Sequence, residues 1–371
     1  MARLFRIILV LTIISPFVSC SKEDDNDSGK VSKRTIILFM PYSGMQRYFA
    51  QNISDWKTAI GEGILHDERV VACISSSVSK ASMIELRYIK GKGVADTLSV
   101  YEDLNFTSQA GIEKILHDVS VVAPAESYAI IIGGHGSGWL PAGTSVKKSL
   151  GSQTADSQIG IETVSGALEN SGLKFDYILF DDCYMSNIES VYEFKDVVDY
   201  IIGCPTEIMI YGFPYLNCAQ CLVGDVDYEG LCDKFIDFYS DYDTPCATIG
   251  VTKCGELDSL ASIFREINVS GGFDLQKLDE VQKMDGYDPT LFWDLGDYVG
   301  LLCTDEHLRE IFRRQLERAV PFNGHTKSFY CERSGYEDIA TFCGVSISAP
   351  TETTVQMGLL DTKWWRECVA R

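Results

Sequence analysis

Two apolar stretches that each end on a reactive side chain decide the fold. They are Tyr128-Ala-Ile-Ile-Ile-Gly-Gly-His-Gly-Ser-Gly-Trp139 and Asp176-Tyr-Ile-Leu-Phe-Asp-Asp-Cys-Tyr-Met185. In both, a short run of residues typical of a buried strand stops abruptly, and His135 or Cys183 follows. Parallel strands flanked by helices place such ends side by side, and open α/β sheets bind ligands at that edge. The two stretches therefore predict a thiol and an imidazole at one edge of a sheet, the components of a cysteine nucleophile and its acid–base partner.

Strand and helix signals alternate on both sides of these stretches. A continuous apolar run over residues 35–40 predicts a strand that is buried on both faces, and residues 69–75 return to strand character. Residues 46–65 and 108–122 carry apolar side chains at helical spacing. This alternation predicts a three-layer α/β fold with a mostly parallel central sheet.

The pattern becomes mainly helical from about residue 256. Residues 257–267 and 307–320 are amphipathic, and residues 342–347 have the composition of one short strand. We therefore predict a catalytic domain over residues 34–255, followed by a mainly helical C-terminal subdomain over residues 256–371.

The first residues have the composition of a targeting segment. Arg3 and Arg6 precede a 12-residue apolar run, and Phe17-Val-Ser-Cys20 resembles the box that directs lipid attachment in bacterial lipoproteins. We predict that residues 1–19 are removed as a lipoprotein signal peptide and that Cys20 carries the lipid. A plain secretory signal is the alternative interpretation.

Residues 20–33 follow as an acidic tether. Their Ser21-Lys-Glu-Asp-Asp-Asn-Asp27 stretch resembles the tag that sends lipoproteins of Bacteroidetes-type bacteria to the cell surface. We expect the protein to be exported and anchored by lipid to the bacterial outer membrane, with display at the cell surface as a further step. The alternative is a solvated tether that carries no targeting signal.

Composition and charge exclude several classes of partner. With 46% hydrophobic and 23% charged residues the chain is an ordinary globular protein. Its net charge is −21 and falls to −23 when residues 1–19, with Arg3 and Arg6, are removed. Such a surface repels nucleic acid and favours cationic ligands. The expected partners are therefore protein or peptide substrates, no nucleic acid, and a membrane only through the lipid.

The chain resembles the clostripain family of cysteine peptidases, which shares a clan with the caspases. Two short blocks each follow an apolar strand, namely His135-Gly136 and Asp181-Asp182-Cys183. The cysteine lies 48 residues after the histidine. A third block, residues 205–215, matches the family pattern as well, and the resemblance covers about residues 34–260. It implies a caspase-like fold and an endopeptidase that cleaves after Arg or Lys.

The resemblance also implies roles for individual residues. Cys183 would be the nucleophile and His135 the acid–base catalyst, and the backbone amides of Gly136 and Cys183 would form the oxyanion hole. The alternative for Cys183 is a small buried hydrophobe, and for the glycines a flexible turn.

Asp181 is the predicted specificity residue. It lies two positions before Cys183, so in an extended segment the two side chains point the same way. In the family an acid at this position forms the floor of a pocket for a basic side chain, and carboxylate pairs well with guanidinium. The alternative is a capping or sheet-edge carboxylate, a role that suits Asp182 better. Thr206, in the third block, is a further candidate for lining the pocket.

The stretch from residue 141 to 158 is rich in Gly, Ser, Thr and Lys and predicts a long exposed loop. Exposed loops are preferred sites of proteolytic cutting, and members of the clostripain family mature by cutting themselves in this region. Lys147 and Lys148 are therefore the predicted self-cleavage points. An ordinary solvated loop is the alternative.

No cofactor is expected. Among thirteen cysteines, Cys218-Ala-Gln-Cys221 is the only Cys-x-x-Cys pair, and without a second pair it indicates a local disulfide or simple burial more than a metal site. Calcium matters for some family members, but the sequence has no calcium-loop motif. The alternative function is a catalytically silent surface binding module with the same fold. A disulfide-exchange module built on Cys218 and Cys221 lacks any thioredoxin-like context.

Overall fold

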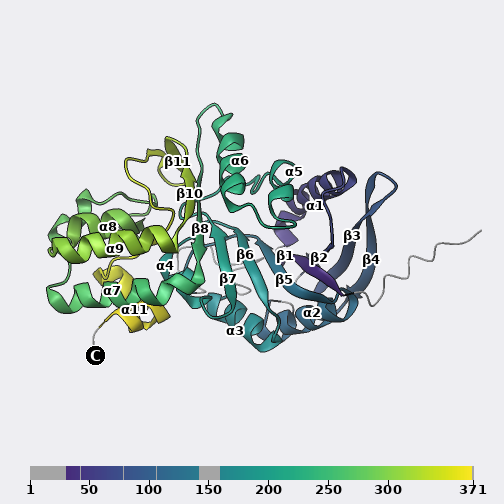
Figure 1. The fold of residues 1–371 in the computed structure, drawn as a ribbon, viewed down its shortest axis with the longest axis horizontal. Coiled ribbons are helices and arrows are strands. Elements are labelled where there is room, and N and C mark those ends of the chain that lie inside the picture. The colour runs from purple at the N-terminus through teal and green to yellow at the C-terminus, as the bar shows by residue number, and fades with distance from the viewer. Residues whose placement is uncertain (1–30, 42, 78, 106, 142–158, 370–371) are drawn as a thin grey trace, which may run out of the picture.

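The computed structural model describes residues 31–369 except positions 42, 78, 106 and 142–158, and it has a three-layer α/β architecture (Figure 1). Its centre is a nine-stranded sheet with the order β10-β8-β7-β6-β5-β1-β2-β3-β4. The strands are β1 (Ser32–Met40), β2 (Glu68–Ser77), β3 (Lys80–Ile89), β4 (Lys92–Tyr101), β5 (Ala125–Gly133), β6 (Phe175–Asp181), β7 (Val198–Gly203), β8 (Thr248–Lys253) and β10 (Phe322–His325). The five strands β1, β2, β5, β6 and β7 are parallel, and antiparallel strands flank them on both sides. The mostly parallel sheet predicted from the sequence is confirmed.

Helices cover both faces of the sheet, as Figure 1 shows. Ile36 and Leu38 of β1 belong to the core on the face covered by α1, α5 and α6, whereas Ile37 and Phe39 belong to the core under α2, α3 and α4. The helices of the first group are α1 (Gln46–Gly61), α5 (Tyr215–Cys218) and α6 (Tyr228–Ser240), and those of the second are α2 (Gln109–Val122), α3 (Ile161–Ser171) and α4 (Ile188–Glu193). Because both faces are buried at the centre of the sheet, strands such as β1 and β5 carry continuous apolar runs rather than alternating ones.

Local signals fix several helix ends. The Ser108 side chain accepts a hydrogen bond from the Gly111 N–H at 3.2 Å and begins α2. Asp227 begins α6 in the same way, through the Gly230 N–H at 2.9 Å. At the other end of α3, Gly172 has a φ of 64°, a left-handed conformation that terminates the helix and favours glycine.

The C-terminal part is mainly helical, as predicted, and it completes the sheet and the core of the preceding part. Strand β10 comes from this part and pairs with β8 of the central sheet. Buried side chains of α7, α9 and α11 join the same core as α2, α3 and α4. The elements here are α7 (Leu257–Ser270), β9 (Trp293–Asp294), α8 (Leu295–Leu302), α9 (Glu306–Ala319), β11 (Ser328–Cys331), β12 (Gly335–Asp338), β13 (Ser346–Ile347), α10 (Glu352–Gln356) and α11 (Lys363–Cys368). The domain boundary after residue 255 stays a prediction.

Short 3-10 helices connect several of these elements, namely η1 (Ser43–Met45), η3 (Ala219–Cys221), η4 (Cys254–Glu256), η5 (Leu275–Glu280) and η6 (Leu359–Asp361). The strand expected over residues 342–347 is limited to β13, which pairs with β9. Gly344, just before β13, has a φ of 89°. An extended strand cannot include a left-handed residue, so the segment turns there and only its end pairs.

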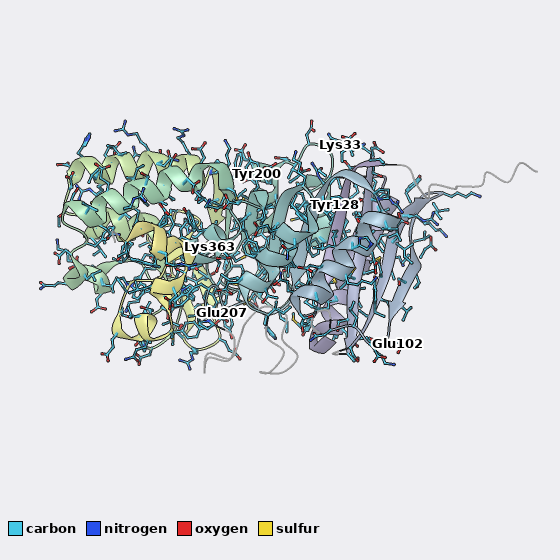
Figure 2. The ribbon with its side chains drawn as sticks, turned by 90° about the horizontal axis from the view of Figure 1, so that it is seen from below. Lys33, Glu102, Tyr128, Tyr200, Glu207 and Lys363 are labelled. Atoms are coloured by element: carbon cyan, nitrogen blue, oxygen red, sulfur yellow. The ribbon has the colours of Figure 1, made fainter. Side chains whose placement is uncertain are left out.

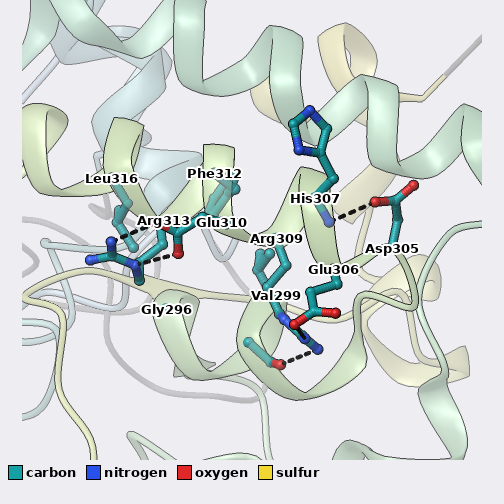
Figure 3. Close-up of a pocket in the computed structure, with 11 residues that line it drawn as sticks. Gly296, Val299, Asp305, Glu306, His307, Arg309, Glu310, Phe312, Arg313 and Leu316 are labelled. Carbon is teal, nitrogen blue, oxygen red and sulfur yellow. Dashed lines mark hydrogen bonds and ion pairs between the residues drawn. The ribbon is translucent and has the colours of Figure 1, made fainter.

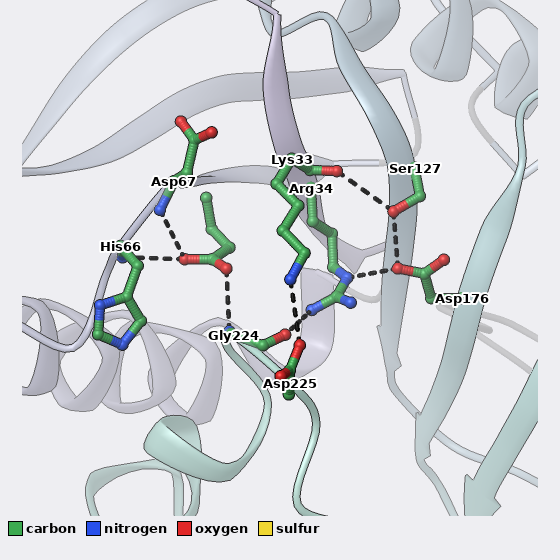
Figure 4. Close-up of polar contacts among 9 residues, drawn as sticks. Lys33, Arg34, His66, Asp67, Ser127, Asp176, Gly224 and Asp225 are labelled. Carbon is green, nitrogen blue, oxygen red and sulfur yellow. Dashed lines mark hydrogen bonds and ion pairs between the residues drawn. The ribbon is translucent and has the colours of Figure 1, made fainter.

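A polar network ties the parallel strands together where they begin (Figure 4). Arg34 of β1 donates to the Asp176 carboxylate of β6 at 2.6 Å, and Ser127 of β5 donates to the same oxygen at 2.6 Å. Arg34 also donates to the Gly224 carbonyl at 2.9 Å. Because charge-assisted hydrogen bonds are strong and directional, this network fixes the relative register of the strands whose opposite ends carry the reactive residues.

Candidate active site

The pairing of β5 with β6 brings the two predicted reactive residues to one edge of the sheet. Gly133, the last residue of β5, lies opposite Asp181, the last residue of β6. His135 and Cys183 each follow two positions later, so both reach the edge at which the parallel strands end. Figure 2 shows Glu207, which follows β7, at the edge opposite the one that carries Lys33.

The backbone of Gly136 lies directly on the backbone of Cys183. A Cβ built on Gly136 would lie 2.2 Å from the Cys183 carbonyl oxygen and 3.0 Å from its nitrogen. No L side chain can occupy that space, so the glycine after the histidine is required by close approach rather than by flexibility. The two amides predicted to form the oxyanion hole therefore belong to neighbouring pieces of backbone.

Cys183 is held in a tight turn that exposes little of it. Its side chain is 8% exposed, and its Sγ lies 3.8 Å from the Ile208 carbonyl oxygen. The next residue, Tyr184, has a φ of 61°, which is uncommon for a residue with a side chain. The Tyr184 N–H donates to the Thr206 carbonyl at 2.9 Å, and its ring stacks on Phe292 with centroids 5.1 Å apart. Such constrained backbone is typical of functional sites.

Both reactive residues line one cavity of about 440 Å³. Its walls come from five separate parts of the chain, namely the α1 region, the end of β5, the end of β6, residues 207–212 and the β11 region. The lining side chains other than His135 and Cys183 include Tyr48, Phe49, Asn52, Asp181, Glu207, Met209, Tyr211, Tyr330 and Glu332. Sequence reasoning found the strand ends but missed the contributions of α1 and the β11 region, because no local pattern signals a contact between distant segments.

Asp181 lines this cavity and also organises one of its walls. Its Oδ1 accepts the Phe213 N–H at 2.9 Å and its Oδ2 accepts the Tyr215 hydroxyl at 2.8 Å. Burial raises the pKa of Asp181 to about 6, and the hydrogen bonds from Tyr215 and Phe213 oppose that shift. A carboxylate has about four lone-pair sites, so an ionised Asp181 can hold this wall and still accept a hydrogen bond from a cation in the cavity.

Asp182 does not cap a helix or lie at an exposed sheet edge, the role that its sequence position suggested. The Asp182 side chain is fully buried. A Cβ built on Gly136 would lie 2.8 Å from the Cβ of Asp182. Burial raises the pKa of Asp182 well above its ordinary value, and the neighbouring Asp181 raises it further. The alternation of an extended chain turns Asp182 away from the cavity that Asp181 and Cys183 face.

Thr206 is not among the described residues that line the cavity. Its side chain is fully buried, and its hydroxyl lies 2.7 Å from the hydroxyl of Thr248. The neighbouring Glu207 lines the cavity instead. The Glu207 carboxylate accepts the Tyr184 hydroxyl at 2.9 Å and the Glu332 N–H at 3.1 Å. Glu207 thus connects Tyr184, the residue after Cys183, with the C-terminal wall, although the sequence block that contains Glu207 pointed to Thr206.

A second cavity, of about 920 Å³, lies in the C-terminal part (Figure 3). It is lined mainly by α8 and α9, where Arg313 pairs with Glu310 at 2.8 Å and with Glu317. Although larger, it shares no lining residue with the cavity at Cys183. The smaller cavity is the candidate active site, because Cys183, the predicted nucleophile, and the His135 imidazole both line it.

The remaining predicted sites fall into two groups. Cys20, Lys147 and Lys148 lie outside the described residues. Cys218 and Cys221 are both buried free thiols, and burial raises the pKa of Cys218 to about 12. In the described part of the chain, no group of three or more His, Cys, Asp or Glu side chains could hold a metal ion.

Comparison with known proteins gives several matches. The model of the clostripain family matches residues 43–284. The structure of a secreted C11 cysteine protease from Bacteroides thetaiotaomicron, "iotapain", is 42% identical with a TM-score of 0.88, and the match covers 91% of this chain and 99% of that one. A comparison with curated proteins gave no match.

Two further solved structures are similar. A clostripain from Bacteroides thetaiotaomicron ATCC 29148, in complex with the peptide inhibitor BTN-VLTK-AOMK, is 47% identical with a TM-score of 0.58, and the match covers 59% of this chain and 99% of that one. An inactive zymogen C11 protease from Parabacteroides distasonis is 27% identical with a TM-score of 0.81, covering 92% of this chain and 99% of its own.

The family match spans more than half of the sequence and includes both strand ends and the block at residues 205–215. The likeness to iotapain extends over nearly the whole of both chains, in sequence as well as in fold. The protein is therefore a member of the clostripain family and a cysteine peptidase.

Proposed function

We propose that this peptidase cleaves protein and peptide chains after arginine or lysine, with Cys183 as the nucleophile and His135 as the acid–base catalyst. The observation that carries the proposal is the register of β5 on β6, through which His135, Cys183 and Asp181 contribute to one cavity. A nucleophile, a proton carrier and an anionic wall in one enclosed space are what cleavage at a basic residue requires.

The reaction follows from these positions. The Cys183 sulfur, as the thiolate, attacks the carbonyl carbon of the scissile peptide, and the N–H groups of Cys183 and Gly136 donate to the developing oxyanion. The C–N bond then breaks, His135 gives a proton to the leaving amine, and a thioester remains on Cys183. A water molecule that loses its proton to His135 attacks the thioester. Release of the new carboxyl terminus restores the sulfur.

The charge of the cavity supports a basic side chain in the substrate. Its described lining contains Asp181, Glu207 and Glu332 but no lysine or arginine. An Asp181 carboxylate can hold guanidinium by two parallel hydrogen bonds and ammonium by a point charge. The similar clostripain structure holds a peptide inhibitor, BTN-VLTK-AOMK, in which lysine precedes the AOMK group. We extend that basic preference to this chain.

Fluorogenic peptides that end in arginine, lysine, aspartate or leucine test the proposal. We expect the first two to be cleaved, and we expect Cys183→Ala and His135→Ala to abolish the cleavage. Cys73→Ala is the matched control, since Cys73 is also a buried free cysteine but lies on β2, outside the cavity lining. Activity that survives Cys183→Ala would eliminate the proposed nucleophile. A wild type inactive on every peptide would favour a silent binding module.

We propose further that the enzyme matures by cutting itself after Lys147 or Lys148. Both lysines lie in the stretch that follows His135, and a site specific for basic residues can act on them. Cleavage after Lys148 would give a C-terminal fragment of residues 149–371, about 60% of the 371 residues. The similar clostripain chain, matched over 99% of its length, covers 59% of this one. A related C11 protease is described as an inactive zymogen, which supports activation as a separate step.

Purified wild type should separate into two fragments on a denaturing gel, and Cys183→Ala should stay whole. The variant in which both lysines become alanine should also stay whole and show low activity on peptides. N-terminal sequencing of the heavier fragment identifies the cut. Full activity of an uncut double variant would disprove activation at these residues.

We also propose export and a lipid anchor on Cys20. The related iotapain is described as secreted, which supports export. Among the described residues, no helix is long and apolar enough to cross a membrane. A diacylated cysteine would provide the two chains that stable anchoring needs. Detergent partitioning of wild type and Cys20→Ala tests this, and equal partitioning of both would contradict it. Surface display is tested separately by adding protease to intact cells.

We propose that catalysis needs no metal ion, since cysteine, histidine and backbone amides supply every proton and charge in the scheme above. Self-cut enzyme dialysed against EGTA should keep its activity on peptides. Loss of activity that returns with added calcium would contradict this.

A further inference from the structure

The segment that carries His135 is fixed at its far end by the C-terminal part of the chain. We call residues 134–140 the histidine loop. Nε1 of Trp139 in this loop donates a hydrogen bond to Oγ of Ser348 at 2.7 Å, across 209 residues of sequence. Trp139 is 4% exposed and Ser348 is fully buried. This link between the histidine loop and the C-terminal part is thus a buried hydrogen bond rather than a surface one.

Ser348 is itself held by a buried carboxyl group. Its backbone N–H donates to Oε1 of Glu189 in α4 at 3.0 Å. The same oxygen accepts Nε1–H of Trp365 in α11 at 2.9 Å. Glu189 is fully buried and Trp365 is 3% exposed. A continuous path of buried hydrogen bonds therefore runs from α11 through Glu189 and Ser348 to Trp139.

The histidine loop needs such external support. Residues 133–138 contain four glycines, and glycine imposes little conformational preference of its own. Gly138 has a φ of 62°, and a Cβ on it would lie 3.1 Å from the Tyr184 carbonyl oxygen and 3.2 Å from the Phe292 ring. The loop therefore follows the shape of its surroundings, and the attachment at Trp139 acts together with the contact of Gly136 on Cys183 to hold the segment that carries His135.

We propose that Ser348, held by Glu189, is a positioning residue for the catalytic histidine and acts through the indole of Trp139. The proposal rests on the assignment of His135 as the acid–base catalyst. Ser348 is not among the described residues that line the cavity at Cys183. Loss of its hydroxyl leaves the buried Trp139 N–H without its acceptor and releases the end of the loop.

The expected effect is on turnover rather than on substrate binding. A misplacement of about 1 Å in a catalytic group can lower the rate by about a hundredfold. Asp181, which is proposed to bind the substrate, lies on β6 and accepts its hydrogen bonds from residues 213 and 215, outside this path. A displaced His135 should therefore lower kcat and leave KM unchanged.

Kinetics of Ser348→Ala, Trp139→Phe and the double variant on a lysyl peptide test the proposal, with self-cut enzyme in each case. We expect Ser348→Ala and Trp139→Phe each to lower kcat by about tenfold to a hundredfold at constant KM. The double variant should fall no further than the worse single one, since both changes remove the same bond. Additive losses would overturn the proposal.

Tyr177→Phe is the matched control. It removes another buried hydrogen bond between distant parts of the chain, from the Tyr177 hydroxyl to the Leu222 carbonyl at 3.0 Å, away from the histidine loop. We expect its kcat to equal that of the wild type. An equal loss of kcat in Tyr177→Phe and Ser348→Ala would mean that general destabilisation, not positioning, explains both.

A second measurement does not depend on turnover. In Cys183→Ala protein with histidine labelled with ¹³C at Cε1 alone, the five histidines give five signals, and His135→Ala assigns one of them. We expect Ser348→Ala and Trp139→Phe to shift the His135 signal and Tyr177→Phe to leave it in place. An unmoved signal in both loop variants would overturn the proposal. If wild type cleaves no peptide, the proposed function fails, while this spectrum still decides whether Ser348 positions the loop.

Discussion

The Tyr215 hydroxyl donates a hydrogen bond to Oδ2 of Asp181 at 2.8 Å, so the residue proposed to bind the substrate cation also holds a wall of its own pocket. The Phe213 N–H occupies the other oxygen at 2.9 Å. Gly212 lies against the same carboxylate, since a Cβ built on it would be 2.4 Å from Oδ1. Substitution of Asp181 therefore changes both a charge and a turn, and experiments must separate the two.

We expect Asp181→Ala to lower kcat/KM for arginyl peptides by at least about a hundredfold. Removal of one partner of a buried charge pair costs about 3–5 kcal/mol, and about 1.4 kcal/mol corresponds to a tenfold change in rate. Tyr215→Phe removes one hydrogen bond of the wall but keeps the charge, and we expect a loss of about fivefold, equivalent to the ~1 kcal/mol that one hydrogen bond contributes. Equal losses in the two variants would show that Asp181 acts on the wall alone.

The ionisation of Asp181 should be visible in the pH profile. Burial raises its pKa to about 6, and only the ionised form can pair with a cationic substrate. The kcat/KM for arginyl peptides should therefore rise as the pH increases through about 6, until Asp181 is ionised in the free enzyme. Asp181→Asn should lose this part of the profile and keep the parts that belong to Cys183 and His135. A profile near pH 6 that is the same in Asp181→Asn and in wild type would contradict the assignment.

Gly136→Ala should remove activity without unfolding the protein. The added Cβ would lie 2.2 Å from the Cys183 carbonyl oxygen, so the backbone that carries His135 must move away from the nucleophile. A shift of about 1 Å is enough for a loss of about a hundredfold. Gly300→Ala in α8 is the control, because a Cβ there meets nothing within 4 Å. Peptide cleavage and circular dichroism of both variants test this, and a fully active Gly136→Ala would refute the close contact.

Stability should decrease as the pH rises toward neutrality. Burial raises the pKa of Glu189 and of Asp285 to about 7, above their ordinary values of 4.5 and 3.8. Between the ordinary and the raised pKa the folded protein holds protons that the unfolded chain has lost, so the free energy of unfolding falls with increasing pH. The contribution is fully present below about pH 4 and is lost by about pH 7.

Thermal unfolding at pH 5.0 and pH 7.5 measures this, in Cys183→Ala protein to prevent self-digestion. We expect a higher Tm at the lower pH, and we expect Glu189→Gln and Asp285→Asn to reduce the difference. An exposed control such as Glu102→Gln, whose side chain is 64% exposed, should leave the difference unchanged. A difference in Tm that neither buried variant reduces would contradict the role of these two groups.

The sequence alone determined the sheet and the two strand ends. Strands β5 and β6 are continuous apolar runs that stop at a glycine and at an aspartate, and local periodicity predicts such elements without knowledge of their neighbours. The amphipathic helices α2, α7 and α9 followed from spacing in the same way. Because parallel strands end at one edge, a common position for His135 and Cys183 followed directly from these local patterns.

Tertiary structure decided which distant residues complete the site. Glu332 reaches the carboxylate of Glu207 across 125 residues, and Ser348 reaches Trp139 across 209. No periodicity records such contacts, since they depend on how β10, β13 and α11 pack around the sheet. The same packing buries the side chains of Asp182 and Thr206, and it places Glu207 in the wall of the pocket. Local patterns set what each segment becomes, and burial in the folded core sets which of its side chains face the cavity.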